Sequence, residues 1–154
     1  MAFLSATCLI CERVLRETDN AVSVIRLVNI FSFKSIPDLP VDKQAVPIVV
    51  FGIVQFSAND DDKHTVVLVI VRPDGEQSEV PLTTDQQIPV GPIIELPRAA
   101  HIIAQLGVVP RQVGIHQVVL KVDGIERART QFVLRQAPDD PTLELSGSPP
   151  QVLG

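Results

Sequence analysis

Residues 114–134 read GIHQVVLKVDGIERARTQFVL, and this stretch decides the fold class. The even positions from His116 to Val122 carry His, Val, Leu and Val, whereas Gln117 and Lys121 fall between them. Alternation with a period of two is typical of a β-strand that buries one face. Asp123-Gly124 is a dipeptide that favours a tight hairpin turn. The stretch therefore predicts two antiparallel strands that turn at residues 123–124.

The register of this hairpin decides which side-chain faces meet. The returning strand places neutral side chains on one face and polar or basic ones on the other: Ala128, Thr130, Phe132 and Leu134 against Arg127, Arg129 and Gln131. A strict two-residue turn would pair Leu120 with Arg127 and set an apolar face beside a basic one. A three-residue loop with a left-handed Gly and a G1 bulge keeps Val118 with Ala128. We predict the bulged hairpin.

Working outward from this hairpin, further apolar segments separated by turn residues predict more strands. They run from about Ser5 to Arg16, Ala21 to Phe33, Val46 to Phe56 and Thr65 to Val71, with a short edge strand near Gln77 to Leu82. About seven or eight strands at this spacing predict an all-β fold, a two-sheet antiparallel sandwich.

Two of these segments leave alternatives open. Both faces of residues 21–33 are mostly apolar, which indicates either a strand covered on both sides or one whose register shifts at a bulge. Residues 97–106 fit a short helix or a strand. We favour the strand there, because a helix would be the only one in the chain.

Composition supports one β domain followed by a tail. The chain has 154 residues, of which 45% are hydrophobic, and valine and isoleucine dominate that content. β-Branched side chains suit a pleated sheet because their χ1 angle is already restricted. We expect a β-sandwich domain over residues 1–136. Residues 137–154 are acidic and proline-rich, without aromatic residues, and predict a flexible tail.

Charge and hydropathy restrict the expected partners and location. A net charge of −5 argues against nucleic-acid binding, which requires clustered Lys and Arg side chains. The Lys and Arg residues between positions 107 and 135 are interpreted as part of a solvated sheet face. No apolar run approaches the roughly 18 residues that span a bilayer, and no charged leader precedes Arg13. We therefore expect a soluble, cytoplasmic chain that binds another protein or itself, with no nucleic acid and no membrane.

The cysteines form a C-x-x-C pair at Cys8 and Cys11. On a strand these positions point to opposite faces and lie roughly 10 Å apart, beyond the span of a disulfide. A zinc site would need two further ligands, and neither a second C-x-x-C nor paired histidines follow. We expect two reduced, largely buried thiols.

The remaining chemistry-bearing residues form no recognisable motif. His64, His101 and His116 are isolated, and Ser57 and Thr65 lie in no nucleophile elbow. Residues 59–62, Asn-Asp-Asp-Asp, could offer oxygen ligands to calcium, but they lack the alternate spacing of an EF-hand, so a solvated turn is favoured. We therefore predict no catalytic, cofactor-binding or metal-binding residues, and no cofactor.

The order of these signals resembles a family of small, uncharacterised bacterial proteins with an immunoglobulin-like β-sandwich. The resemblance spans about residues 5–135 and rests on these features: Cys11-Glu12 with Val14, the turn at Thr18 to Asn20, Val22 to Phe33 leading to Ile36-Pro37, Arg72 to Gly75, and Gly114 to Gly124. His116 stands where such proteins usually place an aromatic residue, often Tyr. The resemblance implies the fold, and neither a reaction nor site residues.

The function expected from these features is a non-enzymatic protein-interaction or accessory module. The alternative is a structural subunit that associates with itself, for instance through sheet edges. A hydrolase or metal enzyme comes third, and it would require His116 or His101 to share a cleft with a cysteine or a carboxylate.

Overall fold

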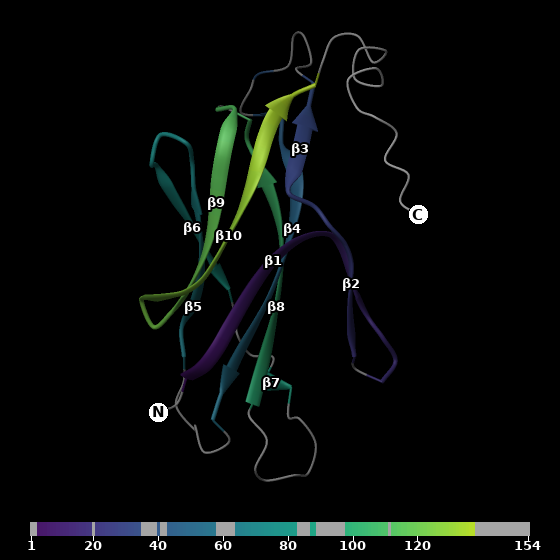
Figure 1. Ribbon diagram of the computed structural model, residues 1–154, viewed down its shortest axis with the longest axis vertical. Coiled ribbons are helices and arrows are strands. Elements are labelled where there is room, and N and C mark those ends of the chain that lie inside the picture. The colour runs from purple at the N-terminus through teal and green to yellow at the C-terminus, as the bar shows by residue number, and fades with distance from the viewer. Residues whose placement is uncertain are drawn as a thin grey trace.

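The computed structural model describes residues 3–19, 21–34, 40, 43–57, 64–82, 87–88, 98–110 and 112–137. Ten β-strands lie in these ranges (Figure 1). They are β1 (Phe3–Arg16), β2 (Val22–Leu27), β3 (Ile30–Phe33), β4 (Val46–Phe56), β5 (Val66–Val71), β6 (Gln77–Leu82), β7 (Gln87–Ile88), β8 (Arg98–Val108), β9 (Gly114–Val122) and β10 (Ile125–Gln136).

The strands form two five-stranded sheets. Sheet A has the order β2-β1-β4-β8-β7, and sheet B has the order β3-β10-β9-β5-β6. Neighbouring strands are antiparallel, except that β3 pairs with β10 in parallel. The predicted all-β fold of two sheets, consistent with a sandwich, is confirmed. There are more strands than expected because the segment at residues 21–33 is divided and the short β7 is added.

The hydrophobic core lies between the sheets and takes alternate residues from each central strand. On β9 the predicted inward positions are all buried, and on β10 Phe132 and Leu134 face them at 1% and 0% exposure. Residues 98–108 form β8, so the strand expected near residues 97–106 is confirmed, and β6 coincides with the expected edge strand.

The β9–β10 hairpin corrects the predicted loop. Asp123 and Gly124 have φ angles of 52° and 80°, and Val122 pairs with Ile125, so the turn has only two residues and is of type I′. The register shifts two residues later, between Glu126 and Ala128. Leu120 therefore pairs with Ala128 and not with Arg127. The three-residue loop was wrong because the type I′ turn already matches the strand twist, and the required bulge lies within β10.

The segment from Ala21 to Phe33 is not one strand, because it changes sheets. β2 pairs with β1, whereas β3 pairs with β10. Arg26 has a φ of 55°, and the link between the strands is held on both sides. The Val28 N–H donates to the Ile10 carbonyl at 3.1 Å, and the Val133 N–H donates to the Asn29 carbonyl at 2.7 Å. The two apolar faces of this segment therefore serve two different sheets.

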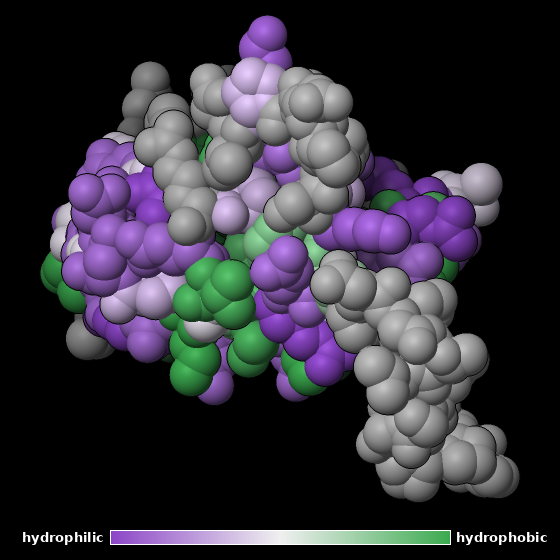
Figure 2. Space-filling view, turned by 90° about the horizontal axis from the view of Figure 1, so that it is seen from above, coloured by the Kyte–Doolittle hydropathy of each residue, from purple (hydrophilic) through white to green (hydrophobic). Residues whose placement is uncertain are grey.

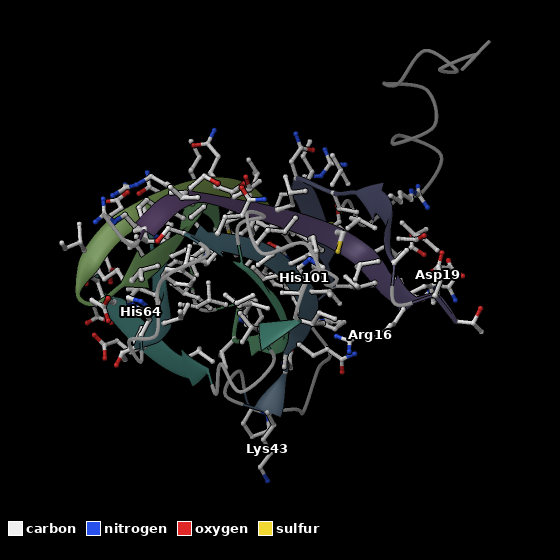
Figure 3. The ribbon with its side chains drawn as sticks, turned by 90° about the horizontal axis from the view of Figure 1, so that it is seen from below. Arg16, Asp19, Lys43, His64 and His101 are labelled. Carbon is white, nitrogen blue, oxygen red and sulfur yellow. The ribbon has the colours of Figure 1, made fainter. Side chains whose placement is uncertain are left out.

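The second half of β1 and β2 form an arm, which we define as residues 12–27. Figure 1 shows this arm turning down at the right of the picture, opposite β5, β6 and β9 of sheet B at the left. Figure 3, which looks along the strands from below, places Arg16 of the arm beside His101 of β8. Phe51, on the outward face of β4, is only 4% exposed. The outer face of sheet A is therefore partly covered.

The expected tail falls almost entirely outside the described residues, as does the Asn-Asp-Asp-Asp turn at residues 59–62. The last strand ends at Gln136, and the Ala137 N–H donates to the Phe33 carbonyl at 2.7 Å. The division into a domain over 1–136 and a tail over 137–154 stays a prediction.

Candidate functional site

A cavity of about 290 Å³ opens at the seam between the two sheets, where β1 and the β2–β3 link approach β10. We call it the seam cavity. Its lining combines aliphatic side chains with neutral hydrogen-bonding ones: Leu9, Ile10, Leu27, Val28, Asn29, Thr130 and Gln131. None of these side chains is ionisable. This combination suits a ligand with an apolar body and neutral polar groups.

The pairing of the strands explains why the seam stays open. β1 pairs with β4 through residues 3–11 and with β2 through residues 11–16. β10 pairs with β9 along most of its length, but with β3 only from Val133 onward. The edge of β10 at Thr130 and Gln131 therefore faces β1, which belongs to the other sheet.

Backbone hydrogen bonds fix the β2–β3 link, which lines part of the seam cavity. Val28 is tied to sheet A through Ile10, and Asn29 is tied to sheet B through Val133. Two adjacent residues of the link thus connect both sheets, which positions Asn29 before any ligand arrives. Such preorganisation lowers the entropic cost of binding.

Exposed apolar side chains flank the seam cavity. Leu27 is 65% exposed at its rim, and Ile30, the first residue of β3, is 48% exposed. From above, Figure 2 shows hydrophobic groups reaching the surface among hydrophilic ones. Apolar surface beside a cavity adds contact area for a ligand that extends beyond it.

His64 forms a second arrangement, with Asp123 in the β9–β10 turn. Its Nδ1 lies 2.6 Å from Asp123 Oδ2, and its ring stacks on Phe56 with centroids 4.2 Å apart. The other carboxylate oxygen, Oδ1, accepts the Thr65 N–H at 3.0 Å. The hydrogen bond from His64 and that from Thr65 lower the pKa of Asp123. The pair ties the start of β5 to the hairpin turn.

His116 lies in the core and not in a cleft. It is 1% exposed, its ring stacks on Phe132 with centroids 5.0 Å apart, and its Nδ1–H donates to the Gly114 carbonyl at 3.2 Å. Burial lowers its pKa and therefore favours the neutral ring. The imidazole thus packs as a neutral aromatic ring in the core.

His101 is half-buried under the arm. Its Nδ1 is buried without a hydrogen-bond partner, and its ring lies 5.8 Å from that of Phe51. Burial, and then the charge of Arg16, lower its pKa. In Figure 3 His101 and His64 lie apart, on different elements, so the structure does not bring these two histidines together.

Both cysteines are free and buried, as expected. Cys8 contributes to the core between the sheets, and burial raises its pKa to about 12. Cys11 is 1% exposed, and its Sγ lies 3.8 Å from the Val49 carbonyl oxygen. Two thiols of this kind are unreactive at neutral pH, because the thiolate is the nucleophilic form.

Within residues 107–135, the described arginine side chains face solvent. Arg127, Arg129 and Arg135 are exposed. Arg129 donates to both carboxylate oxygens of Glu126, at 2.6 and 3.0 Å, and to the side chain of Gln117. Arg127 lies 4.2 Å over the ring of Phe3. These contacts fit the predicted solvated sheet face.

Within the described ranges, no three His, Cys, Asp or Glu side chains are placed to share a metal ion. The same part of the chain contains no helix with the length and apolar character needed to cross a membrane. The prediction of no site residues concerned chemistry at His, Cys and Asp, and it did not anticipate the seam cavity. The feature of the sequence that could have pointed to this cavity is Asn29, a polar residue inside an apolar run.

Comparison with solved structures gives a partial match to Pseudomonas fluorescens alkylpurine DNA glycosylase AlkC bound to DNA containing an abasic site analog. The TM-score is 0.46 at 14% identity, over 83% of this chain and 30% of that chain. The expected partners, another protein or itself with no nucleic acid and no membrane, are corrected by this DNA-bound match. The exclusion of nucleic acid is withdrawn, and a likeness at this TM-score assigns no partner in its place.

Known proteins place the chain in a family without assigning it an activity. No curated protein matches it. A model of a family of unknown function, DUF6941, matches residues 6–135, which include all but the ends of the described sandwich. The chain therefore belongs to this family of unknown function, DUF6941.

Proposed function

We propose that the chain is a non-enzymatic binding module and that the seam cavity is its ligand site. The observation that carries this proposal is the convergence of aliphatic walls with Asn29, Thr130 and Gln131 at one opening between the sheets. A cavity of about 290 Å³ lies near the lower end of the range of small-molecule sites.

The chemistry of the lining defines the class of ligand. Leu9, Leu27 and Val28 offer contact to a branched aliphatic group, while the amides of Asn29 and Gln131 can donate and accept hydrogen bonds. Because the lining has no ionisable side chain, a charged ligand would be desolvated there without a countercharge. The expected ligand is neutral, with an aliphatic group between amides.

The non-enzymatic part of the proposal draws support from the contacts of the histidines. His116 is stacked in the core, and His64 ties β5 to the hairpin turn. The rings of His116 and His64 thus both have structural roles. Neither lines the seam cavity.

We also propose that the sandwich is immunoglobulin-like. The order β1-β4-β8-β7, facing β10-β9-β5-β6, corresponds to strands A-B-E-D and G-F-C-C′ of that fold. His116 near the start of β9 then takes the place of the corner tyrosine of strand F. A bacterial cytoplasm is the proposed location, which the two free thiols support.

The binding proposal is tested by NMR titration with N-acetyl-leucine methylamide, using N-acetyl-glycine methylamide as the matched control ligand. We expect the leucine probe to shift the amide resonances of Asn29 and Thr130 with a Kd of about 1 mM, a typical strength for so small a ligand. The glycine probe lacks the aliphatic group and should bind several-fold more weakly.

A filling variant locates the site. Gln131→Trp places a large ring at the cavity lining and should abolish the response to the leucine probe. Gln136→Trp, an exposed glutamine on the same strand outside the cavity, should leave it unchanged. Equal responses in both variants, or equal binding of the two probes, would overturn the proposal.

A further inference from the structure

Leu27, the last residue of β2, combines two properties. It lines the seam cavity, and at 65% it is more exposed than any other large hydrophobic residue in the described part of the chain. The other aliphatic residues of the lining, Leu9, Ile10 and Val28, are buried or half-buried. Leu27 therefore keeps apolar surface in water at the rim of a cavity that suits an aliphatic group.

The backbone around Leu27 is held in place. Leu27 pairs with Cys11 of β1, and the next residue, Val28, donates its N–H to the Ile10 carbonyl at 3.1 Å. Movement at this position is therefore confined to the side chain. An exposed side chain changes rotamer within nanoseconds, so Leu27 can turn without any movement of a sheet.

The residue before Leu27 has an unusual backbone conformation. Arg26 has a φ of 55°, in the left-handed region that residues other than glycine rarely adopt, and its guanidinium lies 3.3 Å from a carboxylate oxygen of Glu12. Residues held in this way cluster at sites that clamp a ligand. The strained residue lies immediately before the most exposed side chain of the cavity lining, which points to a role of this position in binding.

Contact between Leu27 and a ligand would depend on the chemistry of the ligand. When Leu27 closes over an aliphatic group, apolar surface of both partners leaves the water, which favours the closed rotamer. A ligand without an aliphatic group offers no such surface, so Leu27 then stays in solvent. The same side chain therefore responds to one chemical feature of the ligand.

We propose that Leu27 is the gate of the seam cavity: its side chain turns from solvent onto the aliphatic group of a bound ligand, and it thereby selects ligands that carry such a group. This inference rests on the proposed function, because the gate acts on the ligand of that site. The apolar selectivity of the site then depends on an exposed residue as well as on the buried walls.

The selectivity between the two probes tests the gate. Leu27→Ala should bind N-acetyl-leucine methylamide about three- to ten-fold more weakly than the parent chain, and should bind N-acetyl-glycine methylamide with unchanged strength. Leu15→Ala is the matched control, an exposed leucine of the same arm outside the cavity, and should keep the selectivity of the parent chain. Leu27→Met restores a long apolar side chain and should recover most of the affinity for the leucine probe.

Methyl NMR spectra of the parent chain report on the gate directly. Binding of the leucine probe should shift the methyl resonances of Leu27 and give nuclear Overhauser contacts between them and the methyl groups of the probe, while the methyl resonances of Leu15 stay unchanged.

The outcomes separate the gate from the ligand site. Equal selectivity in the parent chain and Leu27→Ala would overturn the gate and keep the site. Binding of both probes weakened by the same factor in Leu27→Ala would also overturn it, because the role of Leu27 would then be structural. Absence of leucine-probe binding by the parent chain would reject the proposed function itself.

Discussion

Two hairpins of this molecule, β9–β10 and the arm formed by β1 and β2, differ in how much they contribute to the core. In β9–β10 alternate residues enter the core, and Val118, Leu120 and Leu134 are 0% exposed. In the arm no residue from 12 to 27 is buried among those described. The β9–β10 hairpin is stabilised by its own buried side chains, whereas the arm is stabilised by its contact with the outer face of sheet A.

The largest test of this difference is a pair of leucine substitutions. Leu120→Ala should lower the free energy of unfolding by about 2–5 kcal/mol, because it leaves a cavity in the core. Leu15→Ala in the arm, where the leucine is 39% exposed, should cost less than about 1 kcal/mol. Urea denaturation of both variants measures the two losses. Equal losses would show that the arm is as much a part of the core as β9.

Backbone strain sharpens the comparison, because each hairpin contains left-handed residues. Gly124→Ala, at a φ of 80°, should destabilise the turn by about 1–2 kcal/mol. Arg26→Gly, at a φ of 55°, should relieve strain in the arm and offset its lost ion pair with Glu12. Thermal unfolding should therefore give a clear decrease for the first variant and little change for the second. A large loss for Arg26→Gly would contradict this account.

The pH dependence of stability gives the smallest expected effect. Burial lowers the pKa of His116 in the folded chain, so the unfolded chain binds a proton more readily below its ordinary pKa of about 6.5. Stability should therefore fall as the pH decreases from 7 to 5.5, by about 1 kcal/mol from this residue. His116→Phe should remove that part of the slope. A slope that His116→Phe leaves unchanged would place the pH dependence elsewhere, for example at His101 under the arm.

Much of the strand content followed from local pattern. Alternation located β9, because a period of two reports which face of a strand is buried, and segments bounded by turn residues located β4 and β6. The Asp123-Gly124 turn was located as well. Its two-residue form was not, because the compensating bulge at residue 127 depends on how β10 meets both β9 and the ring of Phe3.

The candidate site could not be predicted from pattern. Its lining comes from three separate parts of the chain, around Leu9, Val28 and Thr130, and no spacing in the sequence joins them. The change of sheets at Val28 and Asn29 creates the site. The sequence showed only that both faces of residues 21–33 are apolar.

The sequence by itself determined an all-β chain, the positions of most strands and the burial of its cysteines and of one face of β9. These features depend on neighbours one or two residues apart, so local alternation and turn chemistry are sufficient. Only the tertiary structure decided which sheet each apolar face serves, and where β1 and β10 leave a seam. The pattern that buries a face does not specify the partner that covers it, and the partner here comes from distant parts of the chain.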